Sequence, residues 1–456
     1  MEEFQIDDIF SGLDKEKLVA IIIQQDALIK QLLEDKASLE KRIEELERKS
    51  ARQAAPFRIK ENKRAINPGK PGQKAGHKGY YRVIQESEIE QSIVIELPCC
   101  PDCSGGLQGV RDIEQVIEEI PEVRRRATRV INQCGWCSHC QKEVYSSHPL
   151  QTSLASGAAK VQLGPQAKSI AMSLQYEYGM TKRKVCKLMK KVFDISLSPG
   201  GLVYASHSSA AKMEPHYHSF CKELRQSSVV HSDETSWYVG SPKHWLWVFA
   251  NSNMTVYQVS ASRGRSVITN MIGENYTGTL VSDCLAIYDD VNARQQKCYS
   301  HHLKAIAEAM EKGDENSQAY LQQLKLLLKT AITVKSIKSD KTIRKYQNLC
   351  KALERQADAL ILPERTAQLE EKVANRLRKQ RDHLFTFLYD DQVDATNNLA
   401  ERQLRPAVIA RKVSCGNKTL KGAHTWEIMA SIAAAANQQQ QAFQTMIQQT
   451  IRLSPS

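Results

Sequence analysis

Three consecutive strand-like segments constrain the fold of the second half of the chain most strongly. Each is rich in aromatic and β-branched residues, and the turn sequences GSPKH and NSNM separate them. The three segments are 227–240, 244–250 and 255–262. A helix-like segment from Arg263 to Ile272 follows, and then a fourth strand-like segment, GTLVSDCLAIYDD. This succession predicts a mixed α/β sheet.

A long helical stretch interrupts this pattern. A short strand is expected around Lys297 to Tyr299, and residues 303–388 are then almost wholly helical in pattern. Three strands, a helix, a strand, a helix and a strand is the order of a ribonuclease-H-like sheet. We therefore expect such a core over 225–302 and 389–415, a helical insertion over 303–388, and a C-terminal helical segment over 416–456.

Two acids of this core are expected to lie close together. Asp233 falls near the end of the first strand and Asp283 within the fourth, and these strands are neighbours in a sheet of this kind. Glu401, in DATNNLAERQLRPAVIARK, follows the insertion on a helix. Adjacent carboxylates repel each other unless a divalent metal binds them. Single Asp residues in strands are more often turn or surface residues, but DETSW, VSD and NNxxER occurring together predict a metal site.

The N-terminal segment 13–50 follows a heptad repeat. Leu18, Leu32, Leu39 and Leu46 share one seam position with Gln25, and Ile22, Ile29 and Ile43 share the other with Lys36. This pattern predicts a parallel two-stranded coiled coil, and hence a homodimer. A single amphipathic helix is the alternative, although the apolar stripe is narrow for ordinary globular packing.

A basic segment rich in Gly and Pro follows over 51–88. Its six Gly and Pro residues between positions 68 and 79 exclude a helix, and its apolar content is too low for a core. Such a segment can contact DNA phosphates or enter a minor groove, whereas a solvated linker would have the same composition. The residues expected to contact DNA are Lys70, Lys74, His77 and Lys78.

Two CxxC pairs predict a zinc ribbon over 89–150. Cys100 and Cys103 form one pair, and Cys137 and Cys140 form the other. Two such turns brought together by a hairpin supply the four thiolates that structural zinc prefers. Cys134 also forms a CxxC pair with Cys137, and Cys99 adjoins Cys100, so the first set is preferred without excluding these neighbours.

The segment 160–222 is expected to be helical. Its sequence indicates a helix, a turn at Gly179, a basic helix, a break at Ser198 to Gly200, and another helix. This order fits a helix-turn-helix DNA-binding domain, and it fits a generic helical bundle equally well.

Length and charge agree with a modular DNA-binding protein. A chain of 456 residues predicts about three or four packed units. The formal net charge of +12 suits a polyanionic partner, although many basic proteins share such a charge. Since the sequence contains no apolar run of roughly 20 residues and no signal peptide, we expect a cytoplasmic protein, associated with the nucleoid when it is bound to DNA.

With these motifs, the chain resembles the insertion sequence 66 family of transposases over nearly its whole length. The resemblance rests on the heptad repeat of segment 13–50 (the zipper), on the two cysteine pairs, and on five sequence motifs. These motifs are GQKAGHKG, HSDETSW, LVSDCLAIY, CYSH and NNLAERQLRPAVIARKVSCGNKTLKGA. It implies a DDE enzyme with a ribonuclease-H-like core. Its catalytic acids would be Asp233, Asp283 and Glu401, and its C(2)H motif matches Cys298 and His301. No catalytic acid is missing.

The resemblance implies two Mg²⁺ or Mn²⁺ ions at the acids and double-stranded DNA as substrate, besides the one structural Zn²⁺ expected in the ribbon. Accessory proteins of the same element are possible partners. Asn398 is expected to support the site, and His301 either carries a proton, donates to phosphate or pairs structurally with Cys298. Further phosphate contacts are expected from Arg402, Arg405, Arg411 and Lys412. Two other functions stay open: a non-catalytic DNA-binding regulator, and a nuclease that hydrolyses DNA without rejoining it.

Overall fold

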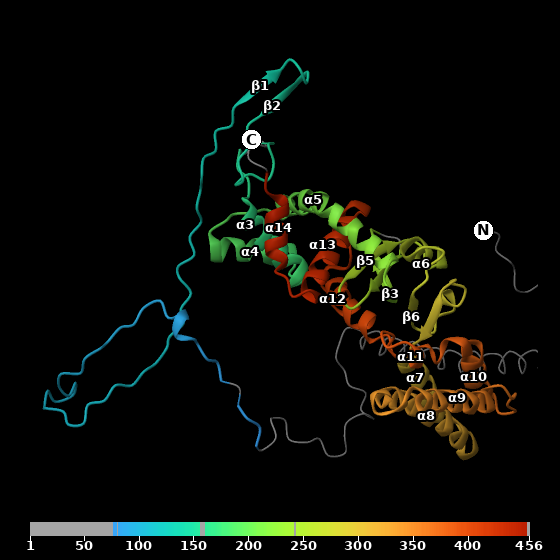
Figure 1. Cartoon of the computed structure of the whole chain (residues 1–456). Helices are drawn as coiled ribbons and strands as arrows, with labels where there is room; N and C mark the ends of the chain where they lie inside the picture. The colour runs from blue at the N-terminus through green and yellow to red at the C-terminus, as the bar shows by residue number, and fades with distance from the viewer. Residues whose placement is uncertain (1–75, 80, 156–159, 241–242, 454–456) are drawn as a thin grey trace, which may run out of the picture. The chain divides into compact units, whose positions relative to one another are not determined.

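The computed structural model describes residues 76–79, 81–155, 160–240 and 243–453, which Figure 1 shows in colour. The chain divides into two compact units, Met1–Glu118 and Glu119–Ser456. The predicted coiled coil, as well as Lys70 and Lys74 of the predicted basic linker, lies outside the described residues. His77 and Lys78 are described and exposed.

The first unit contains a short 3₁₀-helix, η2 (Glu86–Glu88), and the first cysteine pair. The backbone N–H of Cys100 donates to the carbonyl of Gly105 at 2.9 Å, and the N–H of Ser104 donates to the carbonyl of Cys100 at 2.8 Å. Ser104 has a φ of 60°, which closes this tight turn. The turn thus presents two cysteines from one loop, as a zinc knuckle requires.

The second unit begins with the other cysteine pair, on a hairpin. Strands β1 (Cys134–Cys137) and β2 (Lys142–Tyr145) pair antiparallel, and the N–H of Cys140 lies 3.4 Å from Cys137 Sγ. Residues 107–133 are all described and contain neither helix nor strand. Because the two cysteine pairs belong to different units, the four-cysteine zinc ribbon stays a prediction.

A five-stranded sheet forms the centre of the second unit. Its order is β5-β4-β3-β6-β7, in which β3, β4 and β5 are antiparallel, whereas β6 and β7 run parallel to β3. The strands are β3 (Val229–Tyr238), β4 (Lys243–Ala250), β5 (Thr255–Ser260), β6 (Thr279–Ser282) and β7 (Arg294–Lys297). The expected adjacency of the first and fourth strands of this sheet is therefore present.

Four details differ from the sequence prediction. Asp233 lies in the middle of β3 rather than near its end, and Asp283 follows β6 rather than lying within it. The strand stops there because Asp283 Oδ1 accepts the N–H of Leu285 at 3.0 Å, a local bond that competes with strand pairing. The helix expected before the last strand is only a 3₁₀ turn, η4 (Ala286–Tyr288). Strand β7 begins earlier than expected, at Arg294. Its sequence is polar and gave no strand pattern, although its last three residues are buried.

One face of the five-stranded sheet shares a large apolar core with several helices. Some of these helices precede the sheet in the sequence, and others lie within it or follow it. Trp247, Phe249 and Leu280 pack into one apolar cluster with residues of these helices. The helices are α3 (Pro165–Met172), α4 (Lys182–Phe193), α5 (Pro199–Arg225), α6 (Arg265–Ile272), α13 (Leu420–Gln438) and α14 (Phe443–Ile451). The helices expected over 160–222 are thus present but share the core of the sheet instead of packing as a separate unit (Figure 1).

The opposite face contacts α12 (Asn398–Ser414). Its residues Ala400, Leu404 and Ala407 pack into a cluster with Trp237 and Leu246 of the sheet. Gly416, just after α12, has a φ of +86°, and a Cβ there would meet Tyr238 O at 2.4 Å. Only glycine permits this close approach, which joins the end of α12 to the end of β3.

The insertion forms a helical layer of its own (Figure 1). Its apolar core includes Leu321, Leu324 and Leu377, and it continues to Val229 and Val281 of the sheet. Its helices are α7 (Tyr299–Met310), α8 (Glu315–Ser336), α9 (Ile343–Ile361), α10 (Gln368–Lys379) and α11 (Thr386–Tyr389), with 3₁₀ turns η5 (Lys338–Asp340) and η6 (Arg381–His383). The predicted mixed α/β, multidomain class is confirmed. None of the described helices is long and apolar enough to cross a membrane.

Candidate active site

The alternation of side chains along β3 separates two neighbouring acids. Asp233 and Trp237 share one face of the strand, and Trp237 packs with residues of α12. Glu234 lies on the other face, where its Oε2 accepts the hydroxyl of Tyr288 at 2.8 Å. Only Asp233 therefore faces the helix that carries Glu401.

Asp233 lies in an environment that disfavours its charge. Burial, followed by the neighbouring charge of Glu234 and smaller contributions from Asp283 and Glu401, raises its pKa from 3.8 to about 7. One hydrogen bond opposes this shift, from the N–H of Glu234 to Asp233 Oδ1 at 2.8 Å. Asp283 and Glu401, the other two acids predicted from the sequence, thus each lie within electrostatic reach of Asp233.

Asp283 is positioned by the end of the parallel ladder. The N–H of Cys298 donates to the carbonyl of Ser282 at 2.9 Å, so the chain after β7 lies beside the residue preceding Asp283. The loop after Asp283 also contacts the insertion, because Gln380 donates to the carbonyl of Cys284 at 3.5 Å. The helical insertion therefore supports one of the candidate catalytic loops directly.

Glu401 lies in the first turn of α12, where the helix dipole favours a negative charge. The position of this turn depends on Asn397, whose side chain is fully buried. Asn397 Nδ2 donates to the carbonyl of Ser232 at 2.8 Å, and its Oδ1 lies 3.2 Å from His231 Nδ1. Its backbone N–H contacts Cys298 Sγ at 3.1 Å, and its carbonyl accepts the N–H of Glu401 at 3.1 Å.

Asn397 thus joins the three elements that carry Asp233, Cys298 and Glu401, and the sequence prediction missed it. Asn398, which we expected to support the site, is exposed and begins α12. Both residues belong to the same NN pair, and Asn is a common helix cap. Asn397 makes no capping bond, since its side chain contacts β3 instead. Only the packing against β3 distinguishes the two.

Cys298 and His301 lie beside Glu401. His301 Nδ1 is 3.8 Å from Glu401 Oε1, and the neighbouring Cys298 side chain, together with the charges of Asp283 and Glu401, raises the pKa of His301. Among the described residues, Cys298, His301 and Glu401 form the one set of potential metal ligands whose atoms all lie within 4.8 Å of one another. The carboxylate oxygens of Asp233, Asp283 and Glu401 do not all lie within that distance of one another, so the three acids are more widely spaced than this set.

The residue types of the three acids nevertheless fit divalent cations. Carboxylate oxygens are the preferred ligands of Mg²⁺ and Mn²⁺. Within the described part of the chain, no Lys or Arg forms an ion pair with Asp233, Asp283 or Glu401. His301, 3.8 Å from Glu401, is the basic side chain that the described residues place beside them, and a bound cation would supply further positive charge.

The basic residues expected to contact DNA differ in their surroundings. Arg402, Arg405 and Lys412 are exposed on α12. Arg411 Nη1 instead donates to the hydroxyls of Thr235 at 3.0 Å and Ser236 at 2.6 Å. Arg411 therefore holds the end of α12 against β3, and its contact with DNA stays a prediction.

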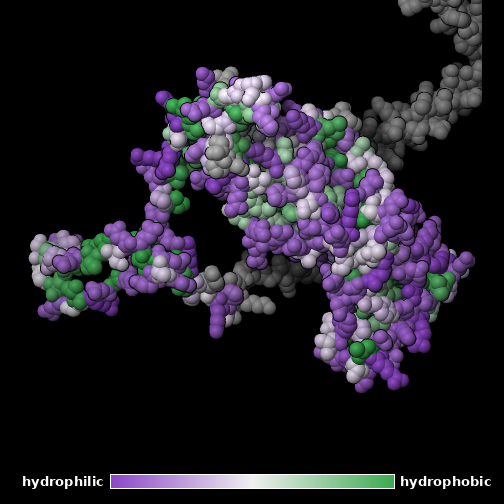
Figure 2. Space-filling model, turned by 45° about the horizontal axis from the view of Figure 1, so that its top comes forward, coloured by the Kyte–Doolittle hydropathy of each residue, from purple (hydrophilic) through white to green (hydrophobic). Residues whose placement is uncertain are grey.

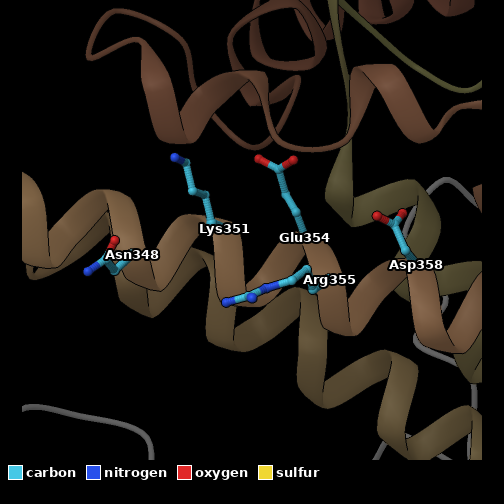
Figure 3. A pocket seen from close by; sticks show the side chains of 5 residues that line it. All are labelled: Asn348, Lys351, Glu354, Arg355 and Asp358. Carbon is cyan, nitrogen blue, oxygen red and sulfur yellow. The ribbon is translucent and has the colours of Figure 1, made fainter.

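A hollow on the insertion lies outside this site. It is lined by Asn348, Lys351, Glu354, Arg355 and Asp358 along α9 (Figure 3). The acids of this hollow already have partners, since Arg381 binds Glu354 at 3.3 Å and also binds Asp358. We therefore interpret it as part of the helical packing rather than as a substrate site.

A sequence family described as the transposase IS66 family matches residues 160–425, which include the whole sheet, the insertion and α12. No curated protein matches the chain.

Proposed function

The chain belongs to the IS66 family of transposases, and from that premise we propose that it cuts the ends of a mobile DNA element and joins the freed 3′-OH ends to target DNA. The observation that carries the proposal is the convergence of Asp233, Asp283 and Glu401 from three separate elements. Nothing in a purely DNA-binding regulator would require three acids there that, within the described residues, have no Lys or Arg partner, so we rank that alternative second.

The three acids would hold two Mg²⁺ or Mn²⁺ ions. Such ions, when bound, would activate an attacking oxygen and stabilise the leaving oxygen of an in-line phosphoryl transfer. Asp233 faces α12 from the middle of the sheet and is our choice for the ligand shared by both ions. Asp283 and Glu401 would each complete one shell. Water would be the attacking group in cleavage, and the freed 3′-OH in joining.

The basic face of α4 supports a second part of the proposal, contact with the DNA duplex. Val185 and Met189 bury one side of α4 in the core. The opposite side exposes Arg183, Lys184, Lys187, Lys190 and Lys191. The turn before α4 contains Gly179 at a φ of +66°, as in a helix-turn-helix connection. Phosphate contacts of this kind would give affinity without reading sequence. Much of the surface visible in Figure 2 is likewise hydrophilic.

The remaining parts of the proposal come from the sequence. The heptad repeat would pair two chains, and the two cysteine pairs would bind one structural zinc ion. Pairing suits a reaction that must process both ends of an element together. Light scattering on the full chain and on a chain that starts near residue 51 tests the dimer. An equally dimeric short chain would contradict the zipper.

The central test separates joining from hydrolysis. Inverted repeats flanking the gene define the substrate, which carries a label at the 3′-OH strand and is mixed with plasmid DNA and Mg²⁺. We expect labelled ends to become covalently joined to the plasmid. Cleavage without joining would identify a nuclease, and binding without cleavage would identify a regulator.

A further inference from the structure

Cys298, His301 and Glu401 form a second group of ligands beside the three acids. Their ligand atoms lie within 4.8 Å of one another, which is a tighter arrangement than that of the acids. Cys298 is fully buried, and the side chains of His301 and Glu401 are 37% and 33% exposed. The group is therefore closed on the thiol side and open to water on the other.

The donor types of this group differ from those of the acid site. A thiolate and an imidazole are ligands for borderline cations such as Zn²⁺ and Co²⁺, whereas Mg²⁺ prefers oxygen alone. We propose that Cys298, His301 and Glu401 bind such a borderline divalent cation, with water or another oxygen at a fourth position. Tetrahedral bonds of about 2.0–2.3 Å place ligand atoms roughly 3.3–3.8 Å apart. The observed group thus needs movements of only about 1 Å, which side-chain rotation can provide.

The backbone holds the group in place. Cys298 and His301 lie three residues apart at the start of α7, so both side chains share one side of its first turn. Cys298 Sγ accepts the N–H of Asn397 at 3.1 Å, the kind of outer hydrogen bond that orients a metal ligand. Asn397 also accepts the N–H of Glu401, which positions the third ligand relative to the first.

His301 adds an independent observation. Its Nδ1 is buried and has no hydrogen-bond partner, although it lies 3.8 Å from Glu401 Oε1. An unpartnered buried nitrogen is costly unless something binds it. A cation between the imidazole, the carboxylate and the thiolate would satisfy this atom.

Sharing Glu401 links the two sites. A carboxylate has two oxygens, so Glu401 can contribute one to this cation and the other to the proposed catalytic centre. A cation held by Cys298 and His301 would thereby set the orientation of Glu401. This link to catalysis rests on the proposed function, but the cation site itself does not.

Cobalt titration of the metal-free full-length protein tests the site, because thiolate bound to Co²⁺ gives a charge-transfer absorption in the near ultraviolet. The proposed zinc ribbon would contribute to that absorption, so variants are compared with wild type. We expect Cys298→Ser to lose one equivalent of bound cobalt and part of the absorption. Cys350→Ser is the matched control, since Cys350 is also fully buried but lies in the core of the insertion.

A second variant keeps the test decisive if Cys298→Ser fails to fold. His301 is partly exposed, so His301→Ala should keep the melting temperature and still lose the same equivalent of cobalt. Equal cobalt binding and equal spectra for wild type, Cys298→Ser and His301→Ala would overturn the site. A loss in Cys350→Ser equal to that in Cys298→Ser would also overturn it, because the effect would then not be specific.

DNA cleavage by the wild type with Mg²⁺ separates this inference from the proposed function. If both variants lose cobalt but the wild type cuts no element end with Mg²⁺ or Mn²⁺, the cation site stands and the proposed function fails. If the wild type cleaves and joins DNA while the variants bind cobalt normally, the proposed function stands and the cation site fails.

Discussion

Two neighbouring acids, Asp233 and Glu234, lie on opposite faces of β3 and have different partners there. On one face, Glu234 is paired with Arg263 at 2.8 Å and accepts a hydrogen bond from Tyr288 at 2.8 Å. Arg263 also lies over the ring of Trp245, 4.2 Å from its centre. On the other face, Asp233 meets two further acids and no basic partner within the described residues. Within the described residues, the protein thus gives Glu234 a basic partner and gives Asp233 none, which is what the proposed cation at Asp233 requires.

This contrast supports Asp233, rather than Glu234, as the proposed metal ligand, which burial alone would not distinguish. Burial raises the pKa of both carboxyl groups, but Arg263 and Tyr288 oppose the shift at Glu234. A structural acid is satisfied within the fold, whereas a metal ligand must keep oxygens free for the cation. Four predictions follow from the difference.

The largest effect should come from Asp233→Asn. Removing this ligand charge should lower the rate of strand cleavage on the order of 10³-fold or more, as loss of a central catalytic group does in other enzymes. DNA binding measured by gel shift should be unchanged, since no basic residue is altered. Asp283→Asn and Glu401→Gln should behave alike. Near-normal cleavage by any one of the three would remove that acid from the site.

Arg263→Ala should instead damage stability. It leaves Glu234, whose side chain is 1% exposed, without its cation. Breaking a buried ion pair costs about 3–5 kcal/mol, and the lower end applies because the side chain of Arg263 is 41% exposed. Urea unfolding measures the loss. The exposed neighbour variant Arg265→Ala is the control, and an equal loss there would contradict a specific role for the pair.

The stability of the metal-free protein should depend on the charge of Asp233. Because folding raises the pKa of Asp233 from 3.8 to about 7, its contribution is greatest below pH 4 and is lost as the pH rises through 7. At pH 8.5, Asp233→Asn should therefore be more stable than wild type by up to about 4 kcal/mol. Mg²⁺ should reduce the difference by stabilising only the wild type. Unfolding of the wild type and of Asp233→Asn at pH 5 and at pH 8.5 tests this prediction. A stability difference between the two proteins that is the same at both pH values would contradict it.

The smallest of the four effects concerns Asn397. Asn397→Asp removes the donor to the carbonyl of Ser232 with little change of shape. Outer hydrogen bonds of this kind affect metal affinity or activity about 10–100-fold. We therefore expect cleavage to need more Mg²⁺, and higher Mg²⁺ to restore part of the rate. Asn398→Asp, in the exposed neighbour, should need no more Mg²⁺ than wild type. Equal requirements in the two variants would show that Asn397 has no positioning role.

Local sequence patterns predicted much of the sheet and the helical insertion. The strands β3, β4 and β5 were visible because they are rich in aromatic and β-branched residues and because turns separate them. The strand β7 was expected a few residues too late because Arg294 to Lys297 is entirely polar, although Gln295, Gln296 and Lys297 are buried. Such a strand is recognised only by its neighbours, since its amides bond to the insertion and to the turn after β6.

The sequence by itself determined which chemistry is available: three acids, a Cys-x-x-His pair and an Asn pair, in an order typical of one kind of sheet. The tertiary structure decided which of these residues work together. In the folded chain, Asp233 faces α12 whereas Glu234 faces Tyr288. Asn397, and not Asn398, bonds to β3, and Arg411 donates hydrogen bonds to β3. The physical reason is that each choice depends on contacts with residues more than 50 positions away in the chain, which no local pattern contains.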